Sequence, residues 1–261
     1  MIEQWRRGIR VFTFRARQLL AVMAAATCAA CAGTPTGTPL QSNAVAAAPS
    51  VAVGDSWTYR VRDAYTGLER GNQRYRVTEA GDRISVAVSR AGAGGDEVRI
   101  FDSAWNWLKH PATHLQTFDY SPAYPAFAFP LAPGKTWRAR LTATDPVDGR
   151  RFTLTVDGTV LGWERIKVPA GEFDALKIKR VVFFDYLEHT VRGRSEILEH
   201  EWYVPAIKQA VRREATAMYL SYLYGGGGSS GFLHAGRRDG GGPRFVRDDW
   251  LIWELVNYSV R

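Results

Sequence analysis

The chain has 261 residues and a formal net charge of +8, and 46% of its residues are hydrophobic and 12% aromatic. A chain this apolar can bury a large core, so the composition excludes an intrinsically disordered protein. Half of the net charge comes from five arginines and one glutamate before residue 18, and no basic stripe interleaved with stacking aromatic residues follows. We therefore expect no nucleic-acid partner.

Residues 1–30 have the pattern of a secretory signal peptide. A positive region over residues 6–17 precedes a short apolar run, residues 19–26, that ends in small residues. This run is much shorter than the ~18–20 apolar residues needed to cross a bilayer, so a permanent transmembrane helix is the weaker alternative. We expect the segment to be removed on export.

Both cysteines of the chain lie where this leader ends. The sequence AACAG at residues 29–33 resembles a bacterial lipobox, in which a small residue precedes the cysteine that receives diacylglycerol. The resemblance implies lipidation of Cys31, whereas Cys28 stands where a lipobox usually has Leu and is the alternative lipidated residue. A redox or metal-binding C-x-x-C pair is a further alternative, but the chain has no third cysteine for a Cys₄ or Cys₃His site.

The resemblance also implies a place in the cell. Ala32 follows Cys31 in place of the Asp that retains many Gram-negative lipoproteins in the inner membrane. It therefore implies a lipid anchor in the outer membrane, at its periplasmic face. Each buried CH₂ of such an anchor adds ~0.8 kcal/mol of membrane affinity, so the membrane is an expected partner.

The mature chain is expected to begin with a tether and to continue as one domain. Residues 31–50 hold the lipidated cysteine followed by small, polar and Pro-containing sequence, which buries too little apolar surface to order itself. We expect a flexible tether over residues 31–50 and a β-rich periplasmic domain over residues 51–261.

From residue 51 the sequence alternates in a way typical of half-buried strands. Residues 57–62, 74–78 and 84–88 place every second apolar residue on one face, and Gly81-Asp82 indicates a hairpin turn. Residues 98–108 continue this antiparallel series. Further strands are expected at residues 136–144, 151–161, 172–186, 191–204, 209–223 and 249–258.

Irregular segments interrupt these strands. Residues 111–133 contain Pro122, Pro125 and Pro130, and proline cannot donate to a strand ladder, so we expect a long loop over the sheet, either a lid or a plug. Residues 225–243 contain two glycine clusters without a Gly-Lys-Ser/Thr ending, which indicates a surface loop and no phosphate site. Asp157-Gly158 is a turn signal or a bulge inside a long strand.

Together these elements predict an all-β fold. We expect a single curved, mostly antiparallel sheet or open half-barrel of about ten strands, with a long Pro-rich loop and a Gly-rich loop. Two expected strands open with the same Gly-x-Ser/Thr-Trp pattern, at residues 54–57 and 134–137. This echo indicates either a duplicated β-unit or a repeated local way to start a strand.

Two longer motifs carry a family resemblance. They read VPAGEFDALKI at residues 168–178 and WYVP at residues 202–205. With the Gly-x-x-Trp openings they resemble the DUF3108 and TapB-like group of bacterial envelope proteins, and the likeness covers about residues 51–214. The chain departs from the family in its Gly-rich insertion and at Lys208-Gln209. The resemblance implies a fold but no activity, because none is established for the family.

Two histidines are weighed as metal ligands. His110 and His114 are four residues apart, but Pro111 opposes a helix that would place them on one face, and no H-E-x-x-H motif is present. Solvent-facing loop histidines are the simpler interpretation, so we predict no metal site.

A cluster of carboxylates is weighed as acid-base machinery. Glu199 and Glu201 share one face of an expected strand, with His200 on the other. Ion pairs with neighbouring cations are the simpler interpretation, and the expected partners are Lys179, Arg192 and Arg194. Since no G-x-S-x-G elbow occurs either, we predict no catalytic residues and no cofactor.

Aromatic residues gather beside and within the Pro-rich segment. The candidate set is Trp105, Trp107, Phe118, Tyr120, Phe127 and Phe129. One interpretation is a hydrophobic plug at one end of the sheet; the other is an apolar groove for an acyl chain, a peptide or a glycan.

These observations favour a non-enzymatic envelope lipoprotein that binds a hydrophobic ligand, a glycan or a protein partner of the envelope. A purely structural or assembly role at the outer membrane is the alternative. An envelope hydrolase is the weakest hypothesis, because no motif supports it.

Overall fold

The structure, a computed structural model, describes residues 37–92, 95–112, 116–188, 191–221 and 244–261. The chain divides into two units, Met1–Thr38 and Pro39–Arg261, and apart from Thr38 all residues of the strands lie in the second. Within the described ranges no helix is long and apolar enough to span a bilayer. The predicted signal peptide, Cys28, Cys31 and the Gly-rich loop lie outside the described residues.

Thirteen strands and a short 3-10 helix, Pro205–Ile207, make up the described secondary structure. The strands are β1 (Thr38–Leu40), β2 (Ser56–Asp63), β3 (Glu69–Glu79), β4 (Arg83–Arg90), β5 (Glu97–Asp102), β6 (Trp107–Pro111), β7 (Thr117–Tyr124), β8 (Thr136–Thr144), β9 (Arg151–Val168), β10 (Gly171–Glu188), β11 (Val191–Val204), β12 (Gln209–Ser221) and β13 (Arg244–Ser259). They form one sheet in the order β1-β9-β10-β11-β12-β13-β2-β3-β4-β5-β6-β7-β8, and β8 also pairs with β9.

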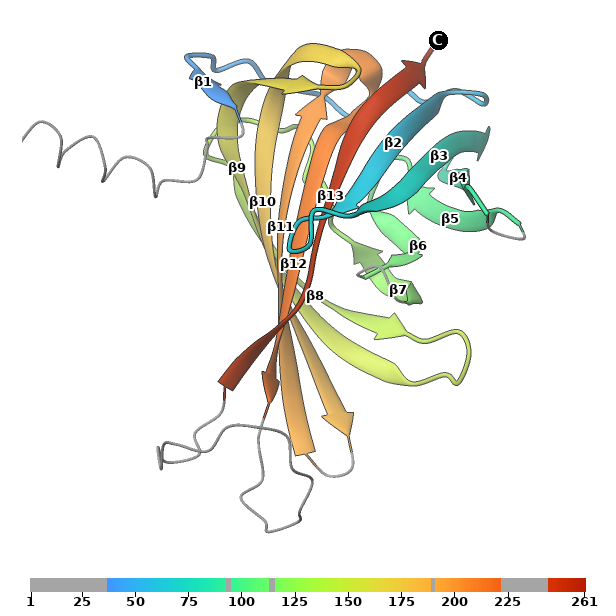
Figure 1. Ribbon diagram of the computed structural model, residues 1–261, viewed down its shortest axis with the longest axis vertical. Coiled ribbons are helices and arrows are strands. Elements are labelled where there is room, and N and C mark those ends of the chain that lie inside the picture. Colours follow the sequence, from blue (N-terminus) through green and yellow to red (C-terminus); the bar gives the residue numbers. More distant parts are fainter. Residues whose placement is uncertain (1–36, 93–94, 113–115, 189–190, 222–243) are drawn as a thin grey trace, which may run out of the picture. The chain divides into compact units, whose positions relative to one another are not determined.

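The β8–β9 pairing closes β2 to β13 into a twelve-strand barrel, with β1 added beside β9. The long strands β9 to β13 form one wall, and the shorter β2 to β7 form the wall opposite (Figure 1). The predicted all-β, antiparallel architecture is confirmed. The predicted open half-barrel of about ten strands is wrong, because the sheet has more strands and its edges meet.

Besides β1, two local features explain the strands that were not expected. Residues 98–108 are two strands, β5 and β6, separated by a turn in which Trp105 has a positive φ of 63°. The Pro-rich segment contains β7, which pairs with β8 only over Asp119–Ser121 and so ends its ladder before Pro122. Proline therefore sits where no ladder donor is needed, and the segment is both strand and loop.

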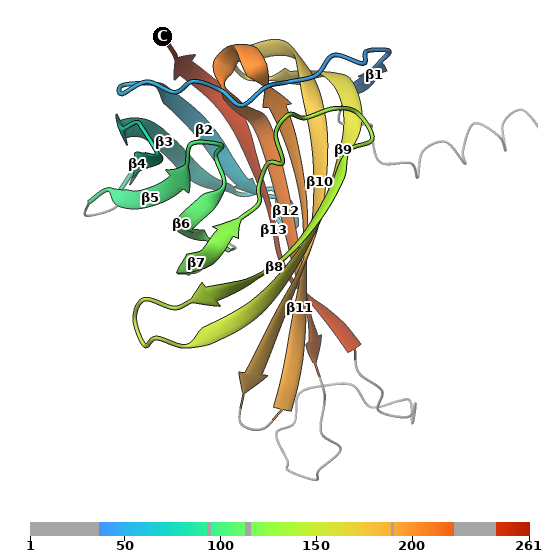
Figure 2. The same cartoon turned by 180° about the vertical axis from the view of Figure 1, so that it is seen from behind.

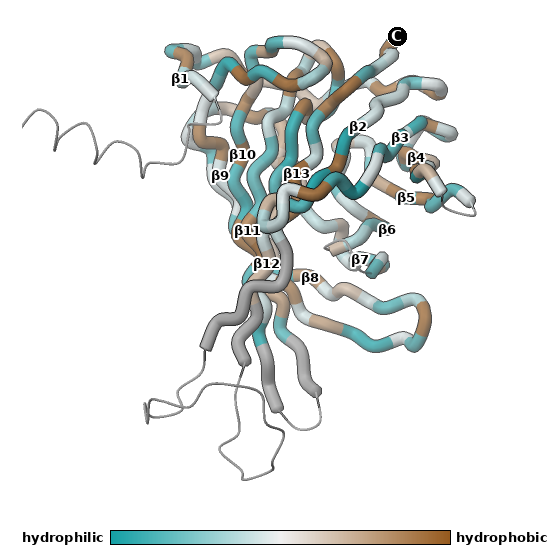
Figure 3. The backbone as a smooth tube through the Cα atoms, in the orientation of Figure 1, coloured by the Kyte–Doolittle hydropathy of each residue, from teal (hydrophilic) through white to brown (hydrophobic). Residues whose placement is uncertain are grey.

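Alternation along the strands fills the barrel with apolar side chains. In β2, Trp57, Tyr59 and Val61 are buried, while Thr58 and Arg60 between them are partly exposed. The same alternation of hydrophobic and hydrophilic positions runs through most of the barrel strands (Figure 3). Burying one face of each strand at roughly 25 cal/mol per Å² of apolar surface is the main stabilising contribution of the core.

Backbone segments cross one end of the barrel. The chain between β1 and β2 runs over this end (Figure 2), where Ala46 forms an isolated bridge with Leu131. Trp163 donates its Nε1–H to the Ala44 carbonyl oxygen at 3.0 Å. Ala44 and Ala46, which we expected in the tether, are therefore bound to the barrel through their backbone groups, which their small side chains could not indicate.

The repeated Gly-x-Ser/Thr-Trp pattern is one local structure used twice. Gly54 donates its N–H to Val77, and Gly134 donates its N–H to Val160, at 2.9 and 2.8 Å. Both glycines have a positive φ, of 95° and 82°, which side chains rarely adopt. Each turn opens a hairpin, β2–β3 or β8–β9, so the echo marks a shared way to start a hairpin.

The β9–β10 hairpin bends at a bulge. Lys177 pairs with Gly162 and Ile178 pairs with Val160, which leaves Leu161 as the extra residue. The hairpin turns at Pro169-Ala170-Gly171 as predicted, and Ala170 donates its N–H to the Leu255 carbonyl oxygen in β13 at 2.9 Å. The bulge thus lets the hairpin tip reach across to a strand that is not its sheet neighbour.

Gly158 is neither a turn nor a bulge. It lies inside β9 directly opposite Trp137 of β8, and a Cβ atom built on it would lie 2.0 Å from Trp137 Cε2. Trp137 is held in place by a hydrogen bond from Nε1 to the Pro125 carbonyl oxygen at 3.0 Å. Glycine is therefore required here because an indole ring covers the backbone.

We expect Gly158→Ala to lower the free energy of unfolding by about 1–3 kcal/mol, because the methyl group must displace the Trp137 ring. Urea denaturation measures this loss, and the double variant Gly158→Ala/Trp137→Ala should lose less than the two single changes added together. Gly81→Ala is the matched control, since no atom lies near its Cβ position. Strict additivity of the Gly158 and Trp137 effects would contradict the explanation.

Candidate functional site

An arginine lies on the inward face of β10. Arg180 is flanked at two-residue spacing by Ile178 and Val182, and all three are buried. Glu199 of β11 is its direct cross-strand neighbour, and Glu201 is in the same way opposite Arg213 of β12. Strand register therefore brings two arginines and two glutamates together inside the barrel, named here the interior charge cluster.

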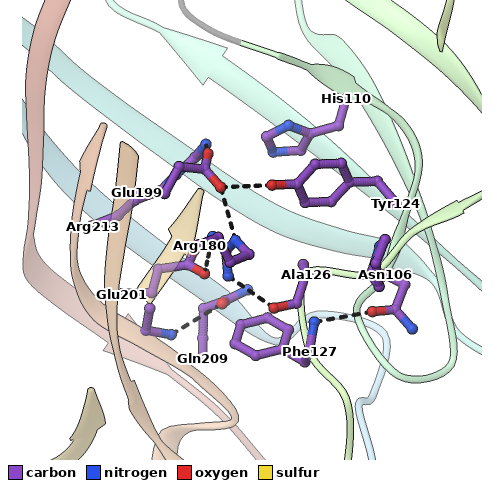
Figure 4. Close-up of polar contacts among 12 residues, drawn as sticks. Asn106, His110, Tyr124, Ala126, Phe127, Arg180, Glu199, Glu201, Gln209 and Arg213 are labelled. Atoms are coloured by element: carbon purple, nitrogen blue, oxygen red, sulfur yellow. Dashed lines mark hydrogen bonds and ion pairs between the residues drawn. The ribbon is translucent and has the colours of Figure 1, made fainter. Parts of the chain in front are cut away.

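Short contacts join the four side chains of the interior charge cluster (Figure 4). Arg180 Nε donates to Glu199 Oε2 at 2.8 Å, and Arg180 Nη2 lies 2.6 Å from Glu201 Oε2. Arg213 Nη2 donates to the other oxygen of Glu199 at 2.5 Å. Glu199 therefore links both arginines, and its side chain is 1% exposed.

The Pro-rich segment is bound to this cluster from the opposite wall. Tyr124 donates its hydroxyl hydrogen to Glu199 at 2.8 Å, and Arg180 donates to the Ala126 carbonyl oxygen at 2.8 Å. Phe127 N–H then donates to Asn106 Oδ1 at 3.0 Å. Of the two expectations for this segment, these contacts match a plug, because its residues lie inside the barrel and are hydrogen-bonded there.

Burial and charge set the protonation of the cluster. Burial raises the pKa of Glu199, but the positive charges of Arg180 and Arg213 outweigh it and lower the pKa from 4.5 to about 2. Burial and the charge of Glu199 raise the pKa of Tyr124 well above 10, so its hydroxyl stays a donor. Glu199 is therefore ionised, and Tyr124 neutral, at neutral pH.

His110 is a buried, neutral imidazole and not a solvent-facing one as we expected. It stacks on Trp107 with ring centroids 3.9 Å apart, and Nδ1 lies 2.7 Å from the Pro111 carbonyl oxygen. Burial, followed by the charges of Arg99 and Arg213, lowers its pKa well below 6.5. Nδ1 therefore carries the proton, and Nε2 accepts from Arg99 Nη1 at 3.5 Å.

Metal binding by His110 and His114 gains no support. His114 lies outside the described residues, and the described ranges contain no group of three histidine, cysteine, aspartate or glutamate side chains placed to hold a metal ion.

Two cavities adjoin the cluster inside the barrel. The smaller, about 50 Å³, is named the aromatic cavity and is lined by Trp57, Tyr59, Tyr75, Val86, Phe101, Trp105, Trp107, His110, Phe127, Glu201, Gln209, Ala210, Arg213 and Trp253. The larger, about 210 Å³, is named the arginine-lined cavity and is lined by Val61, Arg70, Gln73, Arg90, Arg99, His110, Pro111, Arg213, Leu251 and Trp253. His110, Arg213 and Trp253 belong to both, so the cavities meet at these side chains.

The arginine-lined cavity runs from the surface to the interior. Arg70 and Arg90 have side chains that are 58% and 41% exposed, whereas that of Arg99 is 4% exposed. The rim and the floor are therefore both cationic. Its remaining walls include the apolar side chains of Val61, Leu251 and Trp253.

The predicted aromatic set is divided by the structure. Trp105, Trp107 and Phe127 line the aromatic cavity. Phe118 and Tyr120 are buried in the core and Phe129 packs against it, and none of these three lines either cavity. Half of the set thus lines the aromatic cavity and half packs in or against the core away from both cavities, so the six residues do not line one continuous groove.

The carboxylate prediction is correct in one respect and wrong in another. Glu199 and Glu201 do share the inward face, but their partners are Arg180 and Arg213. Lys179 pairs in register with His200, while Arg194 forms an ion pair with Asp185 at 2.7 Å; the side chain of Arg192 is not described. The alternation of Ile178, Arg180 and Val182 was the available signal that Arg180 faces inward.

The barrel is similar to two solved structures. One is a predicted lipoprotein from Parabacteroides distasonis, with a TM-score of 0.50 and 16% identity over 83% of this chain and 100% of that chain. The other is an exported protein with a YmcC-like fold from Bacteroides fragilis, with a TM-score of 0.45 and 16% identity over 82% and 99% of the two chains. The first likeness supports the fold.

No protein-family model matches the chain, and no curated protein sequence is similar to it. The DUF3108 and TapB-like resemblance therefore stays a prediction.

We expect Glu199→Gln to lower the free energy of unfolding at pH 7 by about 3–5 kcal/mol, because two buried arginines lose their shared counter-charge. The folded-state pKa of Glu199 is lowered to about 2. The stability that its ionised carboxylate contributes is therefore fully present above pH 4.5 and is lost as the pH falls toward 2. The difference from wild type should therefore narrow between these pH values in urea denaturation.

The control for this prediction is Glu172→Gln, at an exposed glutamate 3.7 Å from Arg165. Its effect should be small at every pH, because an exposed ion pair contributes roughly 0–1 kcal/mol. A Glu199→Gln difference that stays constant from about pH 5 to about pH 2 would show that the ionised carboxylate is not the stabilising species.

Proposed function

We propose that the chain is an exported lipoprotein whose barrel, anchored to the outer membrane through Cys31, binds a small ligand in its interior and performs no catalysis. The signal-peptide pattern and the lipobox resemblance support the anchor. The likeness of the barrel to a predicted lipoprotein of Parabacteroides distasonis fits this assignment. The observation that carries ligand binding is the arginine-lined cavity, which has exposed arginines at its rim and shares His110, Arg213 and Trp253 with the aromatic cavity.

An open cavity inside a barrel is a costly feature. Protein interiors pack to the density of organic crystals, and unfilled space forfeits dispersion contacts. Here the space is bounded by cations and aromatic side chains, a combination that orients a ligand through a few polar groups on apolar walls. A ligand that fills the space would recover the lost contacts.

The size of the space narrows the class of ligand. A cavity of about 150 Å³ accommodates a benzene ring, so the arginine-lined cavity at about 210 Å³ has room for a ring and one substituent. The aromatic cavity, at about 50 Å³, adds little more. A small molecule therefore fits better than the acyl chain, peptide or glycan considered from the aromatic sequence.

The chemistry of the interior favours binding over catalysis. A general acid or base works best with a pKa near the operating pH. The pKa of Glu199 is about 2 because the charges of Arg180 and Arg213 outweigh the effect of burial, and the pKa of His110 lies well below 6.5 because burial and nearby arginines both lower it. Both groups hold neighbouring elements together and are poorly suited to exchange protons with a substrate at neutral pH.

The anchor is tested by metabolic labelling with radioactive palmitate in a Gram-negative host. We expect the wild-type chain and Cys28→Ala to incorporate label and to fractionate with the outer membrane. Cys31→Ala should lose the label, since the thioether bond to the lipid cannot form. Label that persists in Cys31→Ala and disappears in Cys28→Ala would move the anchor to the other cysteine.

Ligand binding is tested by native mass spectrometry of the full chain purified from its host. We expect a bound small molecule in wild type and none in Val61→Phe, because the larger side chain projects from a buried cavity position. Val53→Phe, at a residue that is 54% exposed, is the matched control and should retain the molecule. Equal mass profiles for all three chains would argue against an interior ligand.

A further inference from the structure

The arginine-lined cavity has an uneven charge balance. Its cationic side chains are Arg70, Arg90, Arg99 and Arg213, and no carboxylate is among the described residues that line it. Four like charges around one space repel each other unless counter-charges lie behind them. The position of those counter-charges therefore decides what the cavity attracts.

The counter-charges are not among the lining residues of the cavity and are too few to balance the arginines. Arg70 has its own partner, Asp63, at 2.8 Å. Arg90 and Arg99 share a single carboxylate, Glu97, at 2.9 and 3.1 Å.

Deeper in the barrel, Arg213 and Arg180 are balanced by Glu199 and Glu201. Five arginines thus meet four carboxylates, which leaves one uncompensated positive charge at the pair that shares Glu97.

His110 does not add to this charge. Its Nδ1 hydrogen is directed to the Pro111 carbonyl oxygen, and its Nε2 faces Arg99. An imidazolium at this place would face the guanidinium groups of Arg99, Arg213 and Arg180, so the neutral form is held. The cavity therefore presents a net charge of about one unit to a ligand.

This balance distinguishes between anions. The planar fork of arginine binds carboxylates and phosphates alike. A phosphate monoester carries a charge of about −1.5 to −2 near pH 7, which exceeds the single uncompensated charge, whereas a carboxylate matches it. The apolar walls formed by Val61, Leu251 and Trp253 also favour a ligand with a hydrocarbon part beside its charge.

We propose that the arginine-lined cavity binds a small monoanionic carboxylate, with the carboxylate on Arg90 and Arg99 from the cavity side and an apolar ring or short branched group against Trp253. This inference rests on the proposed function and names the chemistry of its ligand. The molecule is compact, because the aromatic cavity beyond Trp253 leaves no length for an acyl chain.

Isothermal titration calorimetry of the full chain in a neutral detergent tests the inference with three probes. Sodium benzoate carries the carboxylate and the ring, benzyl alcohol keeps the ring without the charge, and inorganic phosphate keeps charge without the ring. We expect benzoate to bind at least about tenfold more tightly than either of the others, because only benzoate can contact both the arginines and the apolar side chains of the cavity.

Two charge variants change the balance in opposite directions. Arg90→Gln removes the uncompensated charge and should weaken benzoate at least about tenfold. Glu97→Gln adds a second uncompensated charge, so it should tighten benzoate and make phosphate binding measurable. A misfolded variant cannot bind more tightly, so a gain in Glu97→Gln is a result that structural damage cannot produce. Arg138→Gln, whose side chain is 74% exposed outside the cavity, is the control and should change nothing.

The outcomes separate this inference from the proposed function. Benzyl alcohol binding as tightly as benzoate, or equal effects of Arg90→Gln and Arg138→Gln, would overturn the carboxylate and leave an interior ligand site. Binding of every probe that is unchanged by Val61→Phe would place the probes elsewhere and overturn both. Loss of benzoate in Arg90→Gln with a gain in Glu97→Gln would establish both.

Discussion

A guanidinium group almost fully removed from solvent sets the main energetic requirement of this barrel. Arg180 has a side chain that is 1% exposed, and an uncompensated buried charge costs several kcal/mol. The barrel meets this requirement from three directions, with Glu199 and Glu201 on the neighbouring strand and a backbone carbonyl from the Pro-rich segment. The two carboxylates and the carbonyl group are in turn held in position by the arginine, so the side chains around it are arranged by its charge.

The same arrangement accounts for the space beside it. Charged side chains that bind one another cannot also fill the volume as closely as aliphatic ones, and guanidinium groups stack on the aromatic rings around them. Arg213 lies 5.0 Å from the ring centroids of both Trp107 and Trp253. The cavities therefore result from the same packing as the interior charge cluster. This connects the stability of the barrel with its capacity to hold a ligand.

Local patterns in the sequence predict the strands well and their assembly poorly. The bounds of β8 and β11 follow from alternation, turn residues and glycine positions alone. Closure of the barrel depends on β8 meeting β9 and on a strand within a proline-rich segment, where the local signal points to a loop. The inward position of Arg180 was readable from its neighbours, but its partner Ala126 lies 54 residues away in the sequence, and periodicity carries no information over that distance.

The ladders around the barrel are of unequal length. β9 and β10 pair along most of their residues, whereas β7 meets β8 only over Asp119–Ser121. A closed barrel is usually held together by backbone hydrogen bonds between neighbouring strands. In this one, Tyr124 at the end of β7 and Ala126 just after it form hydrogen bonds across the lumen with Glu199 and Arg180, and so tie this short ladder to the opposite wall. A change at Glu199 or Arg180 therefore also affects the β7–β8 part of the wall.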